Sequence, residues 1–453
     1  MLKKINVVGL LLKVSLLNFR EVCLSLTCWA RLAKIADTRL ELVLMKALVL
    51  GAGGVGRAIA NIASRRSFIT EMVIADRNLS RAEDAVNRLK DPRFSAAQVN
   101  AAELEDIREL IRKANPDIVI NAVDPRFVMP IFLACEIENK NYLDMAMSLS
   151  RPHPHYPYTE TGVKCGDEQF ARDWNWSERG IYALIGMGVE PGLSDVFAKY
   201  ASDELFSRID SVTVLDGSNL VVSGSEFAPS FSIWTTIEEC LNPPLVWEDG
   251  RGWYTTEPFS ELEVFDFPEG IGPVECVNVE HEEVVLIPQK IEAKKVNFKY
   301  GLGAQFISIL KTIHMLGMDR TETVDVQGIQ VSPRDLLAAS LPDPATLGSR
   351  MTGKTCAGSL VKGLDKAGEP KAVYLYNVVD NAWSMENYGD QAVVWQTAIN
   401  PVIAMELIHE GVWKPEPGVN GPEWFDSKPF LAKLEEYGTS WHIRDESTAG
   451  IVK

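Results

Sequence analysis

A glycine-rich turn is the first feature of the chain that can do chemistry. It lies in the stretch VLGAGGVGRAIA, which begins at Val49 and passes from an apolar run into a segment with helical spacing. In a strand–turn–helix unit the first glycine permits the tight turn, the second lets the backbone approach a pyrophosphate, and the third allows close packing. The N–H groups that open the helix also attract phosphate. The pattern predicts a dinucleotide site rather than a bare structural turn. The residues predicted to form it are Gly51, Gly53, Gly54, Val55 and Gly56.

Asp76 and Arg77 are the next candidate pair, because they end the second apolar run of the same unit, EMVIADR. An aspartate here accepts hydrogen bonds from the adenosine ribose hydroxyls and repels a 2′-phosphate, which favours NAD. An arginine can instead pair with the 2′-phosphate of NADP. The sequence leaves both cofactors open and favours NAD. Asn121 and Ala122 end a later run, DIVINAV, where we expect the nicotinamide half, although Asn121 can equally cap a loop.

The elements that position these residues alternate between strand-like and helix-like patterns. The alternation begins at Met45 and continues to about residue 191, which predicts a Rossmann domain with a doubly wound parallel sheet. The strand-like segments are KALVLGAG, EMVIADR, FSAAQVNA, DIVINAV, NYLDMA and IYALIGMGVEPG. We therefore expect an α/β fold whose dinucleotide-binding domain covers residues 45–191.

A second, mixed region follows over residues 192–379. Its strand-like segments are IDSVTVLDG, ECVNVEHEEVVLIP and KKVNFKYGLG, and helical segments such as FISILKTIHMLGM separate them. This pattern predicts an α+β substrate domain, through which a homodimer can also form. The long apolar segment GDQAVVWQTAINPVIAMELIHEGVW then predicts a helix. We expect residues 380–453 to form helices that pack back on the Rossmann domain.

The composition excludes several classes of function. The chain has 453 residues, of which 46% are hydrophobic and 24% charged, and its net charge is −17. This acidity argues against nucleic acid or an anionic membrane as partner, because both require a basic surface. The seven cysteines stand singly, without a CxxC pair, so we expect a reduced, cytoplasmic setting. The six histidines form no ligand motif, and we expect no metal site.

The first 44 residues differ from the rest. They begin with a basic segment and an apolar run that superficially resembles a signal peptide, but Lys13 interrupts the run and Arg20 follows it. The run is also too short to span a bilayer. Since Met45 opens the first convincing strand, we expect residues 1–44 to be a non-native or disordered extension. An amphipathic amino-terminal segment is the alternative.

From Met45 onward the chain resembles the saccharopine dehydrogenase superfamily, which includes saccharopine reductases, carboxynorspermidine dehydrogenases and lysine ε-dehydrogenases. The segments that carry the resemblance are GAGGVG, NYLDMA, GMGVEPGLSDVFAKYA, VEHEEVVLIP, FKYGLGAQFISILKTIHMLGM and QTAINPVIAMELI. The resemblance implies hydride exchange between NAD or NADP and a CH–NH bond of an amino acid or polyamine conjugate. It departs from the simplest members in a polar, aromatic insertion over residues 150–180, whose second half has a helical pattern and whose tryptophans can reshape the substrate entrance. It departs also in the strand end ADRN.

The resemblance implies a general acid or base among three residues. Asp144 matches the acid that the family places near the nicotinamide, where burial can raise its pKa; it can also cap the following loop. Glu190 occupies the turn between Gly188 and Pro191 and faces either the substrate amine or solvent. His281 lies in VEHEEVV, where strand alternation would direct it away from the neighbouring glutamates, towards the surface.

The substrate carboxylate requires cationic or amide partners. Arg350, Lys354 and Arg334 are the candidates, in or near the loop region GSRMTGKTCAG, which can be a mobile loop or a solvated turn. Trp234, in SIWTTIEECLNPP, can line an aliphatic pocket or belong to the core.

Two other classes of function compete with the dehydrogenase. A catalytically inactive sensor would bind the dinucleotide without hydride transfer. An enoyl or short-chain alcohol reductase would share the fold, but the Tyr-x-x-x-Lys pair of short-chain enzymes is not evident in the first domain.

Overall fold

The computed structural model of the chain describes residues 45–225 and 227–447. The expectation for residues 1–44 therefore lies outside the described residues. Across the described ranges, none of the helices combines the length and the apolar character that crossing a membrane requires.

The first sheet has seven strands, all parallel, in the order β19-β6-β5-β4-β1-β2-β3. Its strands are β1 (Met45–Leu50), β2 (Ile69–Asp76), β3 (Phe94–Gln98), β4 (Ile118–Asn121), β5 (Asn141–Asp144), β6 (Tyr182–Leu184) and β19 (Gly418–Asn420). Each strand predicted between residues 45 and 191 is present, and the Rossmann arrangement is confirmed. The seventh strand, β19, comes from the end of the chain and was not predicted.

Helices cover both faces of this sheet. They are α2 (Gly54–Ser64), α3 (Leu79–Leu89), α4 (Leu104–Ala114), α5 (Val128–Glu138), α6 (Asp167–Phe170), α7 (Asp173–Glu178) and α14 (Ala392–His409). Helix α4 shows why such segments form: acids occupy its first turn and bases its last, as the helix dipole favours. The short helices α6 and α7 confirm the helical pattern in the insertion. Trp176 of α7 is fully buried against Phe132, at 4.5 Å between ring centroids, so it belongs to the core and not to the substrate entrance.

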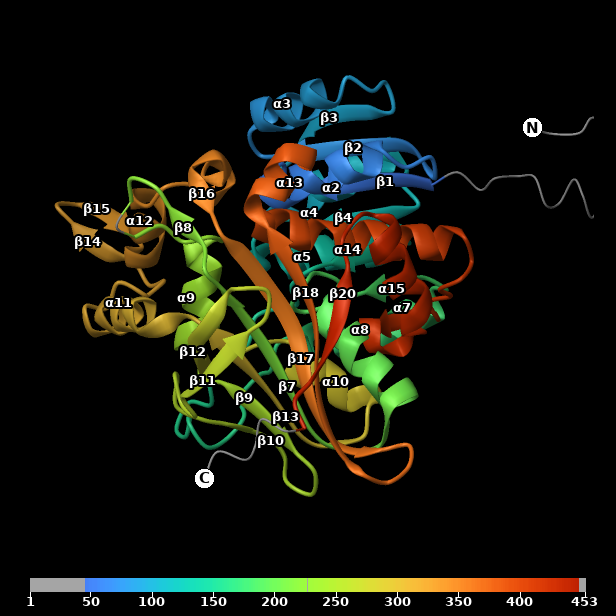
Figure 1. The fold of residues 1–453 in the computed structure, drawn as a ribbon. Coiled ribbons are helices and arrows are strands. Elements are labelled where there is room, and N and C mark those ends of the chain that lie inside the picture. The colour runs from blue at the N-terminus through green and yellow to red at the C-terminus, as the bar shows by residue number, and fades with distance from the viewer. Residues whose placement is uncertain (1–44, 226, 448–453) are drawn as a thin grey trace, which may run out of the picture. The chain divides into compact units, whose positions relative to one another are not determined.

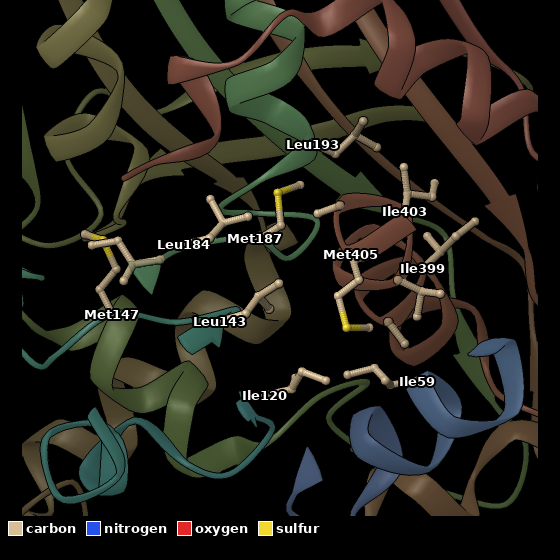
Figure 2. Close-up of a cluster of buried hydrophobic side chains, with 14 of the residues drawn as sticks. Ile59, Ile120, Leu143, Met147, Leu184, Met187, Leu193, Ile399, Ile403 and Met405 are labelled. Atoms are coloured by element: carbon tan, nitrogen blue, oxygen red, sulfur yellow. The ribbon is translucent and has the colours of Figure 1, made fainter. Parts of the chain in front are cut away.

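Helix α14 lies against α2 and closes the core of this part of the molecule (Figure 1). Nearly every residue of α14 is buried, so this helix has apolar side chains around its whole circumference and not along one face alone. Figure 2 shows the contact: Ile399, Ile403 and Met405 of α14 face a cluster that includes Ile120 of β4 and Leu143 of β5. At the edge of this contact Arg66 pairs with Glu406 at 2.7 Å.

The second sheet has nine strands and is mixed. Its strands are β7 (Phe206–Ser218), β9 (Leu245–Glu248), β10 (Gly252–Thr255), β11 (Glu263–Phe267), β12 (Gly272–Asn278), β13 (Ala293–Gly301), β17 (Lys354–Asp365), β18 (Pro370–Asp380) and β20 (Trp441–Asp445). Strands β7 and β13 are parallel, and the other pairs are antiparallel. The α+β character predicted for the second domain is confirmed. Two short hairpin-like pairs complete the strands: β14 (Val324–Val326) with β15 (Ile329–Val331), and β8 (Val221–Val222) with β16 (Met351–Thr352).

The remaining helices are α8 (Leu193–Tyr200), α9 (Ile233–Leu241), α10 (Glu283–Lys290), α11 (Gly303–Met315), α12 (Pro333–Ser340), α13 (Asn381–Tyr388) and α15 (Ser427–Glu436). One of them corrects the sequence analysis: ECVNVEHEEVVLIP is not one strand. Strand β12 ends at Asn278, and α10 begins at Glu283. The run VVLI is buried throughout, and a short buried run does not distinguish strand from helix by its periodicity. The segment after residue 380 is also not purely helical, because it supplies β19 to the first sheet and β20 to the second.

Candidate active site

The glycine turn has the geometry that a pyrophosphate requires. Gly51 has φ +109°, in the range that favours glycine. A Cβ on Gly56 would lie 1.8 Å from the carbonyl oxygen of Gly51, so only glycine lets α2 pack this closely. A Cβ on Gly53 would instead meet no described atom within 4 Å. Helix α2 begins at Gly54, and no side chain among the described residues caps its first N–H groups. The open space above Gly53 and these free donors fit a pyrophosphate.

Asp76 lies at the end of β2 beside this turn. Its carboxylate accepts hydrogen bonds from the N–H groups of Ala52 and Asn78, both at 2.9 Å. These bonds hold the carboxylate at the place where an adenosine ribose would lie, and Arg77 is exposed next to it. The two residues whose side chains favour different dinucleotides therefore stand side by side.

A cavity of about 290 Å³ continues from the glycine turn into the space between the two sheets. Its wall includes four of the predicted cofactor residues, Gly54, Val55, Asn121 and Ala122, together with the predicted residues Glu190 and His281. None of the described lining residues is Lys or Arg. The polar and turn residues of the wall are Gly54, Val55, Asn121, Ala122, Asp124, Glu190, Asp216, Ser232, Thr235, Glu239, His281, Glu282, Tyr300, Asp343 and Thr397.

His281 is the only histidine in this wall, and it is firmly oriented. Its Nδ1 lies 2.5 Å from Oε2 of Glu283, and its ring stacks on Phe298 at 3.9 Å between centroids. Ser194 donates to the other oxygen of Glu283 at 2.8 Å. These contacts leave Nε2 as the free ring nitrogen. The expectation that His281 faces the surface is wrong, because the loop before α10 turns it inward, where it is only 6% exposed.

The carboxylates around His281 favour its protonated form. Burial lowers the pKa of His281, but Glu283, Glu282 and Glu239 together raise it well above its usual range. The ligand atoms of His281, Glu282 and Glu283 all lie within 4.8 Å of one another, a spacing that could suit a metal ion. Nδ1 of His281 is already paired with Glu283, however, so in this arrangement that nitrogen is not free to ligate a metal.

Six of the described lining residues carry a carboxyl group; besides Asp124 and Asp343 these are the four acids Glu190, Asp216, Glu239 and Glu282. Burial, and then the neighbouring acids, raise the pKa of Glu190 well above its usual range. Burial also raises the pKa of Asp216 to about 7 and that of Glu239 to about 8. The fourth, Glu282, accepts a hydrogen bond from the N–H of Met147 at 3.1 Å. Burial thus disfavours the charged forms of these carboxyls, and a cationic guest beside them would favour the charged forms again.

Asn121 and Asp144 have different surroundings. Asn121 lines the cavity; its amide donates to the hydroxyl of Tyr142 at 3.0 Å and its oxygen accepts from the N–H of Val123, as a loop cap would. Asp144 does not line the cavity. Its carboxylate accepts from the N–H of Gly186 at 2.7 Å and from the amide of Gln169 at 2.8 Å. Burial raises its pKa to about 7, but these contacts tie together strand ends below the cavity wall.

The basic candidates for the substrate carboxylate lie outside the wall. Arg350, just before β16, donates to the carbonyl of Ser223 at 2.6 Å, and Lys354, at the start of β17, donates to that of Glu269 at 3.2 Å. Arg334 pairs with Glu238.

Trp234 is also outside the wall. Its indole is buried and donates to Asp335 at 3.1 Å, and the guanidinium of Arg126 lies 4.1 Å above its ring. Of the two roles expected for Trp234, lining an aliphatic pocket or belonging to the core, its position fits the core. Its neighbour Thr235 lines the cavity instead.

Sequence reasoning missed several wall residues. Asp216 ends the strand pattern VTVLDG in the same way as Asp76 ends β2, so a signal was present. Glu239 lies one helical turn after Thr235 on α9, which places both on one face. Tyr300 had no signal of its own, because its position depends on the parallel pairing of β13 with β7, which sets it beside Asp216.

The fold and the site together define a two-domain dinucleotide-dependent enzyme, and comparison with known proteins names its family. Residues 47–184 match the model of the saccharopine dehydrogenase NADP binding domain, and residues 188–439 match that of the saccharopine dehydrogenase C-terminal domain. The chain belongs to the saccharopine dehydrogenase family. Its first domain binds NAD or NADP.

Relatives that match most of the chain agree. The chain is 31% identical to carboxynorspermidine synthase of Vibrio cholerae over 411 residues, which is 88% of this chain and 97% of that one. It is 29% identical to carboxyaminopropylagmatine dehydrogenase of Synechocystis over 404 residues, with the same coverage. Saccharopine dehydrogenase (L-Glu forming) of Saccharomyces cerevisiae has the same fold, with a TM-score of 0.63 and 14% identity over 88% of this chain and 99% of that one.

Proposed function

We propose that the chain is an NAD(P)-dependent dehydrogenase or reductase that acts on a CH–NH bond of an amino acid or polyamine conjugate, with polyamine conjugates preferred. The observation that carries the proposal is the acidic cavity. It continues from the glycine turn, is lined by six carboxyl groups and has no Lys or Arg among its described lining residues. Such a wall attracts a cationic amine and repels a substrate dominated by carboxylates. Two relatives are named for polyamine conjugates, which supports the same class.

His281 is proposed as the group that moves the proton. When bound, the dinucleotide supplies or accepts the hydride. His281 lines the cavity, and Nε2, its ring nitrogen without a partner among the described residues, can give a proton to the substrate nitrogen or take one from it as amine and imine interconvert. Glu283, itself held by Ser194, fixes the ring and stabilises its charged form. Glu190 is the second candidate, and Asp144 is assigned a positioning role below the wall.

The experiment is a turnover assay on the full chain. Purified protein is incubated with NAD or NADP and, in separate reactions, lysine, saccharopine, carboxynorspermidine or carboxyaminopropylagmatine, and the reduced cofactor is followed by absorbance at about 340 nm. We expect reduction with at least one polyamine conjugate. Comparing the two dinucleotides then resolves the roles of Asp76 and Arg77.

A catalytically inactive sensor remains the competing function, and the same experiment separates the two. A sensor would bind the dinucleotide without turnover of any amine. The buried His281–Glu283 pair in the cavity favours the enzyme, because binding alone does not require an oriented proton donor.

A further inference from the structure

One face of the His281 ring is covered by a phenylalanine. Phe298 of β13 stacks on the imidazole with 3.9 Å between the ring centroids and 9° between the ring planes. Phe298 is only 1% exposed and is not among the residues that line the cavity, so its ring belongs to the core behind the wall. Since Glu283 holds Nδ1 of the same imidazole, a benzene ring and a carboxylate together fix the place of His281.

Phe298 is itself held from several sides. Strand β13 lies inside the second sheet, where Phe298 pairs with Val214 of β7. The ring of Tyr300, two residues further along the same face of β13, stands nearly perpendicular to that of Phe298, with 6.3 Å between the centroids and 87° between the planes. A ring packed this closely keeps one orientation. The strand therefore imposes the stacked arrangement on His281.

This stacked geometry distinguishes between the two charge states of the imidazole. Two neutral aromatic rings prefer an offset or edge-to-face arrangement, because their negative π faces repel each other when they meet directly. The rings of His281 and Phe298 are close and nearly parallel, which brings the two faces together. A cation in the same place is instead attracted by the negative face of the benzene ring. The geometry thus suits an imidazolium better than a neutral imidazole.

The titratable groups around His281 act on its charge in a different way. They come from α8 and the turn before it, α9, the start of α10, β7 and β13, and they are Asp195, Glu190, Glu239, Glu282, Glu283, Asp216 and Tyr300. A carboxyl group attracts the imidazolium only while it is charged, and burial raises the pKa of Glu239 to about 8. The benzene ring of Phe298 does not titrate, so its attraction is the same at every pH.

We propose that Phe298 is a positioning residue for the proton transfer, whose ring holds the His281 imidazole face to face and favours its charged, proton-donating form. The inference rests on the proposed function and adds to it a residue outside the cavity wall. An aliphatic side chain would occupy much of the same core space but would not attract the charge. Phe298→Leu therefore separates the effect of the ring from that of simple filling.

The test follows the protonation of His281 itself and uses F94L as the matched control. Phe94 of β3 is also buried, but it lies at the far edge of the first sheet, so F94L removes a core phenyl ring without touching the stack. The full chain is labelled with carbon-13 histidine and titrated by NMR, and the His281 signal is the one that H281N lacks. We expect the ratio of charged to neutral His281 at a given pH to fall by about 2- to 30-fold in F298L and to stay unchanged in F94L.

The pH–rate profile of kcat provides a second measurement. Its limb assigned to His281 should move to lower pH in F298L in step with the NMR titration, while the dissociation constant for NADP stays within about twofold. If F298L does not fold, F298M carries the same comparison, because a methionine fills irregular space without an aromatic face.

The other results have defined meanings. An unchanged or higher ratio in F298L overturns the proposal, and so does an equal fall in F94L, which would show that loosening of the core is sufficient. If His281 stays charged at every pH at which the chains are folded, the pair is compared in the E282Q background, and equal titrations there also overturn it. A lower ratio without any turnover would support the role of the stack and refute the proposed enzyme. Turnover with an unchanged ratio would do the reverse.

Discussion

Adding one methyl group at either of two glycines, Gly53 or Gly56, should have opposite consequences. At Gly56 the new Cβ would lie 1.8 Å from a backbone oxygen, about 1.5 Å short of an ordinary C···O contact. Neither backbone can yield without moving α2 from β1. Overpacking of this kind costs about 1–3 kcal/mol or more. At Gly53 the Cβ would meet nothing described within 4 Å, and φ is −72°, which any residue adopts.

We therefore expect G53A to unfold at the same temperature as the unmodified chain or slightly above it, because alanine restricts the unfolded chain by about 0.4–1 kcal/mol. Its Cβ would nevertheless occupy the space that the pyrophosphate needs. The dissociation constant for NADP should rise at least about 10-fold, or about 1.4 kcal/mol. G56A should lower the melting temperature and weaken binding together.

Differential scanning calorimetry and a fluorescence titration with NADPH measure the two effects on the same samples. If G53A binds the dinucleotide as tightly as the unmodified chain, the pyrophosphate does not approach this turn and the assignment of the turn is refuted. If G56A melts normally, the close packing of α2 on the turn is not what requires glycine there.

Three further predictions concern the cavity. H281N should lower kcat by roughly 100- to 10,000-fold with NADP affinity unchanged; an unaltered pH–rate profile would exclude His281 as the proton donor. Burial raises the pKa of Glu239 from 4.5 to about 8, so the folded state holds this proton more tightly than the unfolded state, and stability falls as pH rises through that window. In urea titrations from pH 5 to 9, the free energy of unfolding should fall less steeply with pH in E239Q than in the unmodified chain. An identical fall in both would count against the raised pKa of Glu239. R350A and K354A, outside the wall, should leave KM within about twofold in the turnover assay, and a large rise in either would return that residue to the substrate site.

Local patterns predicted the part of the site that depends on local structure. The glycine turn follows β1 directly, Asp76 ends β2 and Asn121 ends β4, and parallel strands bring their carboxyl ends to one edge of the sheet. The Rossmann sheet followed from the same alternation. The resemblance to a family added Glu190 and His281, both of which line the cavity.

What could not be predicted depends on contacts between distant segments. The sequence analysis placed His281 at the surface because VVLI fits a strand as well as a helix. In the structure these residues form α10, which packs against β13, and a contact of this kind cannot be read from the local pattern. Strand β19 has three residues, GVN, too few for any periodicity. Lys354 and Arg350 have the positive charge that would suit a carboxylate. Strand β16 pairs with β8, however, and β17 pairs with β18, and neither side chain lines the cavity.

The late strands β19 and β20 affect how the molecule becomes folded. Gly418 of β19 pairs with Tyr182 of β6, and Trp441 of β20 pairs with Asn377 of β18, so one short stretch of chain completes an edge of each sheet. In Figure 1, β20 runs beside β18 while α14 remains against α2. During synthesis each sheet lacks one edge strand until residues 418–445 have been made, and the exposed edges are open to wrong pairing until then. Once β19 and β20 are in place, the loss of either edge strand disturbs the segment that contains both. Unfolding of the first sheet is therefore coupled to unfolding of the second.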